Sequence, residues 1–201
     1  MQLSEKIWNN KNLVETLKEG GVVVMPTDTI YGIVGLAQNE PTVNRIYKIR
    51  KRSPQKHCVI LIGDIGELEK FSINLSEEQK NKLKEYWPVR NASRSDAGGF
   101  ESVSIILDCS NDSLTYLHRG TKSLAFRLPS LQGLRDLLLK TGPLIAPSAN
   151  TEGLPPAQNI SEARKYFGDL VDLYIDGGTV VSKASKVIQL HKDGSVDILR
   201  H

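Results

Sequence analysis

The chain of 201 residues is 39% hydrophobic and 24% charged, which is the balance of a globular domain with its own core. Its net charge of +3 is too small to indicate a nucleic-acid-binding protein by itself, although it permits an anionic small-molecule ligand. No apolar run approaches the roughly 20 residues that cross a bilayer, and residues 1–6 lead into no apolar segment. We therefore expect no membrane span and no signal peptide. Cys58 and Cys109 lack metal-type spacing, so we expect two reduced, structural thiols in a cytoplasmic protein.

Apolar periodicity and turn residues divide the first half of the chain into helices and strands. We expect helices over residues 3–19 and 41–50 and from Ser76 to near Pro88, and buried strands over residues 22–25 and 58–62. Ser76 precedes Glu77, Glu78 and Gln79, which is typical of a helix N-cap followed by acidic residues in the first turn.

The second half alternates in the same way. We expect strands over residues 103–107, 123–128, 144–146, 173–176 and 186–190, helices over 131–140 and 161–167, and a final hairpin strand over 196–199. This alternation predicts an α/β fold, with one mixed parallel and antiparallel sheet flanked by helices in a single domain over residues 1–201. The segment from Val89 to Ser102 (VRNASRSDAGGFES) lacks periodicity and predicts an exposed, flexible loop.

Polar residues follow several of the expected strands, where open α/β sheets bind ligands. The first strand runs into a turn containing Thr27, Asp28, Thr29 and Tyr31. This turn could bind a small polar substrate, or its side chains could simply form local hydrogen bonds. Both interpretations stay open on composition alone.

A basic run, Lys48–Lys56, ends the second expected helix and contains five Lys or Arg residues in nine positions. Such a run could bind a polyphosphate or RNA phosphates. Equally, it could be a solvated helix C-terminus whose charges complement the helix dipole.

Two further features are ambiguous in the same way. Ser148 and Asn150 end the strand over residues 144–146, and they could hold a nucleotide or form an ordinary turn. Arg127 interrupts an apolar strand, so it should pair either with an internal carboxylate or with an anionic ligand. The sequence contains no P-loop, no GxGxxG after a strand and no metal-type spacing of its four histidines.

Taken in order, these segments resemble the threonylcarbamoyl-AMP synthase family with its YrdC-type domain. The resemblance rests on Gly20–Gly32 (GGVVVMPTDTIYG), Lys48–Lys56, Trp87-Pro88, residues 104–107, Leu124–Pro129 (LAFRLP), Pro143–Asn150 (PLIAPSAN) with Gly153, residues 176–178 and residues 185–188. It implies a twisted sheet with a basic concave cleft. It also implies that L-threonine, bicarbonate or CO2, and ATP are converted to threonylcarbamoyl-AMP and pyrophosphate, for the t6A modification of tRNA.

The resemblance also assigns roles to individual residues. It implies that threonine is bound by Thr27, Thr29, Tyr31, Lys56 and Arg127. It implies that ATP and its phosphates are bound by Arg50, Arg52, Ser104, Ser148, Asn150 and Ser185. Mg2+ is expected to arrive with ATP, with no metal ligand and no covalent nucleophile from the protein. The implied partners are a downstream tRNA threonylcarbamoyl transferase complex and a contact with tRNA or double-stranded RNA, with no membrane.

Three departures from the family pattern stand out. Arg50 occupies a clamp position where the family usually has Lys, and the register of the clamp could also be shifted by two. His57 stands where Pro is common. The Trp-Pro-Gly-Pro corner is replaced by the segment over residues 89–102, which we expect to form a flexible insertion at the edge of the cleft.

Two alternative functions compete with the synthase. One is a YrdC-type module that binds RNA or a nucleotide without making the adenylate. The other is a part of a larger carbamoyl-transfer enzyme, which ranks last because such proteins carry extra domains.

Overall fold

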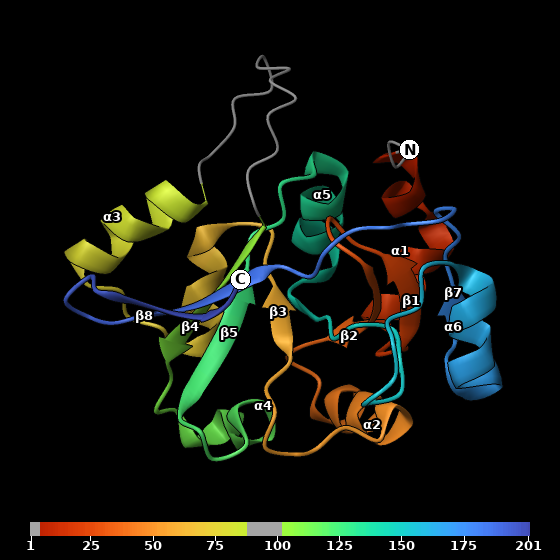
Figure 1. The fold of residues 1–201 in the computed structure, drawn as a ribbon, viewed down its shortest axis with the longest axis horizontal. Helices are drawn as coiled ribbons and strands as arrows, with labels where there is room; N and C mark the ends of the chain where they lie inside the picture. The colour runs from red at the N-terminus through yellow and green to blue at the C-terminus, as the bar shows by residue number, and fades with distance from the viewer. Residues whose placement is uncertain (1–4, 88–101) are drawn as a thin grey trace.

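The computed structural model describes residues 5–87 and 102–201. Within these residues, nine strands form one sheet in the order β7-β1-β2-β6-β3-β5-β4-β8-β9 (Figure 1). The strands are β1 (Val23–Pro26), β2 (Tyr31–Leu36), β3 (Val59–Leu61), β4 (Val103–Asp108), β5 (Ser123–Arg127), β6 (Leu144–Ile145), β7 (Leu173–Tyr174), β8 (Lys186–Leu190) and β9 (Val196–Arg200). Strands β1 and β7, β3 and β5, and β4 and β8 run parallel, and the other pairs run antiparallel. The predicted mixed α/β sheet is confirmed.

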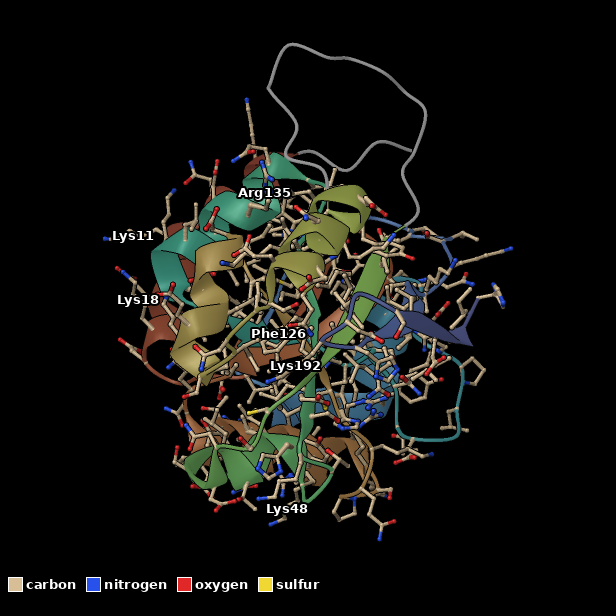
Figure 2. The ribbon with its side chains drawn as sticks, turned by 90° about the vertical axis from the view of Figure 1, so that its left-hand side faces the viewer. Lys11, Lys18, Lys48, Phe126, Arg135 and Lys192 are labelled. Carbon is tan, nitrogen blue, oxygen red and sulfur yellow. The ribbon has the colours of Figure 1, made fainter. Side chains whose placement is uncertain are left out.

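Helices cover both faces of this sheet. The α-helices are α1 (Lys11–Lys18), α2 (Glu40–Arg50), α3 (Glu77–Tyr86), α4 (Thr115–His118), α5 (Gln132–Thr141) and α6 (Ile160–Phe167). Short 3-10 helices are η1 (Glu5–Asn9), η2 (Ile65–Phe71), η3 (Asp112–Leu114) and η4 (Gly168–Leu170). Figure 2 shows Phe126 of β5 in the interior, while Lys11, Lys18 and Lys48 extend outward from the helices.

Alternate residues of the strands feed two apolar layers, as the period of a strand requires. Val24 and Ile33 join the layer that packs against α2, η2, α3 and α6. Val23, Met25 and Leu61 join the layer that packs against η1, α1 and α5. This second helical layer covers the part of the face formed by β7, β1, β2, β6 and β3.

Beyond β3 the same face carries a cavity. Val59 is paired in register with Ala125, and Ala125 with Ile106, so these side chains share the face of Leu61. Val187 is paired with Ser104 and extends that face onto β8. Val59, Ala125, Ile106 and Val187 all line the cavity, which therefore lies where the second helical layer stops.

One predicted helix was wrong, and one strand and the short helix α4 were not predicted. The single helix over residues 3–19 is divided into η1 and α1, because the side chain of Asn10 accepts a hydrogen bond from the Leu13 amide and begins a new helix. Strand β2 was missed, since the segment after Thr29 was read only as a turn. Its Gly35 permits close packing on α2, where an added Cβ would lie 2.4 Å from the Thr42 methyl group.

The N-cap predicted at Ser76 is confirmed. Ser76 and Gln79 exchange hydrogen bonds between the side chain of each and the backbone amide of the other, which forms a complete capping box at the start of α3. The segment predicted as an insertion, residues 89–102, lies outside the described residues except for Ser102.

Candidate functional site

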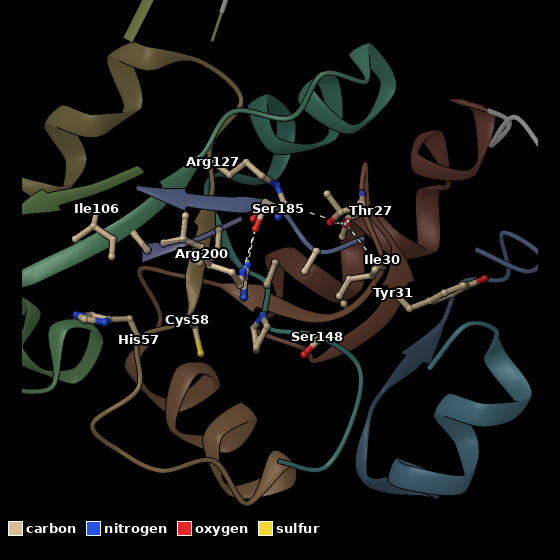
Figure 3. Close-up of a pocket in the computed structure, with 18 of the residues that line it drawn as sticks. Thr27, Ile30, Tyr31, His57, Cys58, Ile106, Arg127, Ser148, Ser185 and Arg200 are labelled. Atoms are coloured by element: carbon tan, nitrogen blue, oxygen red, sulfur yellow. Dashed lines mark hydrogen bonds between the residues drawn. The ribbon is translucent and has the colours of Figure 1, made fainter. Parts of the chain in front are cut away.

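The cavity has a volume of about 250 Å³ and lies between the β1–β2 turn and the β8–β9 end of the sheet (Figure 3). The proposed site residues that line it are Thr27, Thr29, Tyr31, Arg52, Arg127, Ser148 and Ser185. Lys56, Arg50, Ser104 and Asn150 are not among the lining residues. The structure thus brings together side chains that are up to 158 positions apart, from Thr27 to Ser185.

The turn after β1 is both locally hydrogen-bonded and open to the cavity. Thr27 Oγ1 donates to the Ile30 carbonyl at 2.8 Å and accepts from the Thr29 amide at 3.2 Å. The hydroxyl oxygens of Thr27 and Thr29 lie 3.1 Å apart. Local hydrogen bonds thus hold two hydroxyls at the cavity wall, and the binding of a substrate by this turn stays a prediction.

Arg127 forms a buried ion pair with Asp28. Its Nη2 donates to Asp28 Oδ1 at 2.8 Å and to Thr27 Oγ1 at 3.3 Å. Ser102 donates to the other carboxylate oxygen at 3.2 Å. The side chains of Arg127 and Asp28 are 6% and 1% exposed. Within the described part of the chain Arg127 Nε is buried without a hydrogen-bond partner, and the residue lines the cavity.

Arg50 is turned away from the cavity and holds the turn that follows β6. It is 2% exposed, and it donates from Nε to the Asn150 carbonyl and from Nη2 to Asn150 Oδ1, at 3.0 and 2.9 Å. A further bond of 3.2 Å reaches Ser148 Oγ. Burial, together with the nearby Arg52 charge, lowers the pKa of Arg50 to about 10. Arg50 thus supports the turn that carries Ser148, and its direct contact with phosphate stays a prediction.

The loop after α2 carries Arg52 and Lys56, two cations that were predicted to bind substrate, and their contacts differ. Arg52 lines the cavity and donates to the backbone carbonyls of Lys56 and His57, at 3.2 and 2.5 Å. Lys56 instead contacts Glu152, with its Nζ 2.5 Å from Oε1. The other oxygen of Glu152 accepts from the Ser53 amide. Lys56 is therefore held beside the cavity by a carboxylate from the neighbouring loop.

Ser104 and Ser185 form one unit. Their hydroxyls lie 2.8 Å apart, with Ser104 fully buried behind Ser185. Arg200 of β9 donates to the Ser185 carbonyl from Nε at 3.1 Å and from Nη2 at 2.7 Å, and it also lines the cavity. Burial, then the charge of Arg127, lowers the pKa of Arg200. Arg200 was missed because an arginine in a surface hairpin carries no sequence signal of its own.

Tyr31 connects the cavity to the segment after β7. Its hydroxyl accepts from the Gly177 amide at 2.9 Å and donates to the Gly178 carbonyl at 2.8 Å. Burial is the main cause that raises the pKa of Tyr31. The hydroxyl is thus already engaged with the Asp176-Gly177-Gly178 turn, while the residue is among those that line the cavity.

His57 and Cys58 also line the cavity, although neither was predicted to do so. Both cysteines are free and buried, and burial raises the pKa of each thiol. Within residues 5–87 and 102–201, no group of three or more His, Cys, Asp or Glu side chains could hold a metal ion. None of the described helices combines the length and the apolar character that a membrane crossing requires.

Sequence comparison relates nearly the whole chain to one family. The family model described as "Telomere recombination", which covers Sua5, YciO and YrdC, matches residues 15–201. A protein of Chromohalobacter salexigens named threonylcarbamoyl-AMP synthase is 30% identical over 82% of this chain and 82% of its own length. Another of that name, from Bacillus subtilis, is 28% identical over 90% of this chain. The chain spans 51% of the Bacillus subtilis protein, about half of its length.

Solved structures agree with this assignment. Pyrococcus abyssi Sua5 complexed with L-threonine matches with a TM-score of 0.79 and 26% identity, over 100% of this chain and 55% of that one. Escherichia coli YciO has the same fold, with a TM-score of 0.77 at 23% identity over 98% of this chain and 89% of its own. Because the family model covers residues 15–201 and the fold agrees, this chain belongs to the Sua5/YciO/YrdC family.

Proposed function

We propose that the chain is a nucleotidyltransferase that makes threonylcarbamoyl-AMP from L-threonine, bicarbonate or CO2, and ATP. The relatives named threonylcarbamoyl-AMP synthase support this proposal, as does the Pyrococcus abyssi Sua5 structure with L-threonine. The product would be consumed by a tRNA threonylcarbamoyl transferase complex in the cytoplasm.

The observation that carries the proposal is the distribution of polar groups along the cavity. At one part of the wall the hydroxyls of Thr27 and Thr29 lie beside the Arg127 guanidinium, whose Nε is unpartnered among the described residues. This combination suits a small hydroxy amino acid, because guanidinium pairs with carboxylate and hydroxyls exchange hydrogen bonds. Arg52 and Arg200 line the same cavity and supply positive charge for phosphates.

The chemistry needs positioning and charge neutralisation. The amine nitrogen of threonine attacks the carbon of CO2 and loses a proton, which gives a carbamate. A carbamate oxygen then attacks the α-phosphorus of ATP, and the bond to the β-phosphate oxygen breaks to release pyrophosphate. Arginines that neutralise the phosphates and hydroxyls that orient the carbamate would favour this step, and a cavity that restricts water would protect the labile carbamate.

We expect Mg2+ to enter with ATP as part of the substrate. Asp28, the carboxylate next to the cavity, is already bonded to Arg127 and Ser102, so it is not free to bind a metal. The ATP phosphates would then supply the ligands of the ion.

The decisive measurement is pyrophosphate release from ATP, Mg2+ and bicarbonate, with and without L-threonine. We expect release only when threonine is present. Binding of ATP without threonine-dependent release would contradict the synthase and favour a nucleotide- or RNA-binding module.

Replacement of Arg52 tests the phosphate end of the cavity. We expect Arg52→Ala to raise the KM for ATP by about 10- to 100-fold, because loss of a charge-assisted hydrogen bond costs about 1.5–3 kcal/mol. Lys51→Ala is the matched control, because it removes one positive charge from the exposed residue that precedes Arg52. Equal effects of the two replacements would show that only the local net charge matters.

A further inference from the structure

His57 occupies the end of the cavity that the proposed substrate contacts leave unexplained. In Figure 3 it lies with Ile106 on one side of the cavity, opposite Tyr31. The sheet order supports this placement, because β2, which begins at Tyr31, is separated from β4, which carries Ile106, by three strands. The floor between them includes the apolar side chains of Val59 on β3 and Ala125 on β5, and Val187 on β8 continues it beyond β4. This floor suits a flat, weakly polar ring.

The hydrogen bonds around His57 fix its tautomer. Thr121 Oγ1 donates its proton to the His118 carbonyl at 2.5 Å, so it can only accept from the imidazole. His57 Nε2 lies 2.6 Å from Thr121 Oγ1 and 3.2 Å from Ser123 Oγ, and it must therefore carry the ring proton. The neutral ring then presents a lone pair at Nδ1.

That lone pair is available to a ligand. The Nε2 edge of the ring contacts Thr121 and Ser123, neither of which is among the residues that line the cavity, whereas His57 is. Among the described residues Nδ1 has no hydrogen-bond partner. Burial, followed by the charges of Arg52 and His118, lowers the pKa of His57 from its usual value, which favours the neutral imidazole.

We propose that His57 Nδ1 accepts a hydrogen bond from the exocyclic amino group of the purine of the nucleotide substrate, and so selects adenine over guanine. The proposal rests on the use of ATP inferred above and names the residue that reads the base. Adenine carries a donor amine at C6, which complements Nδ1. Guanine carries a carbonyl oxygen at that position, which would place two acceptors against each other.

The test compares three nucleotides with wild-type protein in the pyrophosphate assay: ATP, GTP and purine riboside triphosphate, which lacks the C6 amine. We expect kcat/KM to fall about tenfold from ATP to purine riboside triphosphate, the value of one neutral hydrogen bond with its buried acceptor. We expect a fall of about 100-fold or more for GTP, because its carbonyl also repels the acceptor.

Two variants connect this selectivity to His57. His57→Phe keeps a ring but removes the acceptor, so ATP and purine riboside triphosphate should become equivalent within about twofold. Thr121→Val removes the acceptor that keeps the ring proton on Nε2, so the proton can move to Nδ1. A ring protonated on Nδ1 can donate to the guanine carbonyl, and the ratio of kcat/KM for ATP to that for GTP should therefore fall. His191→Phe, at an exposed histidine paired with Asp197 in the hairpin turn, is the control and should keep the wild-type ratios.

The outcomes separate this inference from the proposed function. An unchanged ratio of ATP to purine riboside triphosphate in an active His57→Phe variant would overturn the role of His57 and leave the synthase intact. If His57→Phe does not fold, equal use of ATP and purine riboside triphosphate by the wild type would overturn the role as well. Loss of threonine-dependent release with every nucleotide would instead contradict the synthase.

Discussion

Two ion pairs flank the cavity, and they differ more in burial than in the distance between their charged atoms. Arg127 and Asp28 lie 2.8 Å apart with side chains 6% and 1% exposed. Lys56 and Glu152 lie 2.5 Å apart, but their side chains are 63% and 21% exposed. A short distance thus occurs in both pairs, and only one is shielded from water. The comparison teaches that the buried pair fixes the shape of the cavity, while the exposed pair can exchange its partners with solvent or substrate.

The largest expected effect comes from removing the buried carboxylate. Asp28→Ala leaves the Arg127 guanidinium buried without a counter-ion, so we expect the free energy of unfolding to fall by about 3–5 kcal/mol in urea denaturation. Asp172→Ala removes a carboxylate that forms a half-exposed pair with Arg45 and also accepts from the Val22 amide, and it should cost about 1–3 kcal/mol.

Equal losses in the two aspartate variants would break the comparison, because burial would then have no influence. If Asp28→Ala does not accumulate as folded protein, Asp28→Asn provides the measurement. It keeps an acceptor for Ser102 and Arg127 and removes only the charge.

An intermediate effect is expected at Arg50, a buried guanidinium whose partners are neutral oxygens. Arg50→Met leaves the oxygens of Asn150 and Ser148 without their donor, and we expect a loss of about 1–3 kcal/mol of unfolding free energy. The KM for ATP should also rise, because the turn that carries Ser148 loosens. Arg45→Met, at a half-exposed position of the same helix, should leave that KM unchanged. A stable Arg50→Met variant with an unchanged KM for ATP would show that Arg50 does not support the turn that carries Ser148.

The smallest effect is expected at the exposed pair. Glu152→Gln should change the thermal midpoint by less than about 2 °C, because water screens Lys56 in both states. The hydrogen bonds from Lys56 and the Ser53 amide lower the pKa of Glu152. Its contribution is therefore present above the unfolded pKa near 4.5 and is lost as the pH falls through the lower folded value. A large shift in the midpoint at pH 7 would place this pair in the same class as Arg127 and Asp28.

Much of the fold could be predicted from local pattern. The capping box at Ser76 and the apolar run before Pro26 specify their elements directly. Strand β2 could not be recognised because it is buried on both faces and lacks alternation, while its two glycines lower its strand propensity. The division of the first helix at Asn10 depends on one side-chain bond that competes with a continuous helix.

The site was harder to predict because adjacent cations face different ways. Arg50 follows Val43, Ile46 and Tyr47 at spacings of seven, four and three, so helical periodicity places it on the buried face of α2. The high density of Lys and Arg in the run Lys48–Lys56 favoured an interpretation from charge over one from helical periodicity. Arg52, two residues later and beyond the helix, lines the cavity instead. The ion pair of Arg127 and the cavity contact of Arg200 depend on strand order, which a single sequence does not contain.

The order of the strands has a consequence for how the protein acquires its cavity. Val23 of β1 pairs with Leu173 of β7, and the cavity wall at Arg200 belongs to the last strand, β9. These long sequence separations give a high contact order. A high contact order slows folding, because the entropy cost of bringing distant segments together comes before their contacts stabilise the fold. Nucleotide binding should accordingly appear only when the β8–β9 hairpin has joined the sheet. A refolding experiment that follows ligand fluorescence would then report the final step of assembly and miss every earlier one.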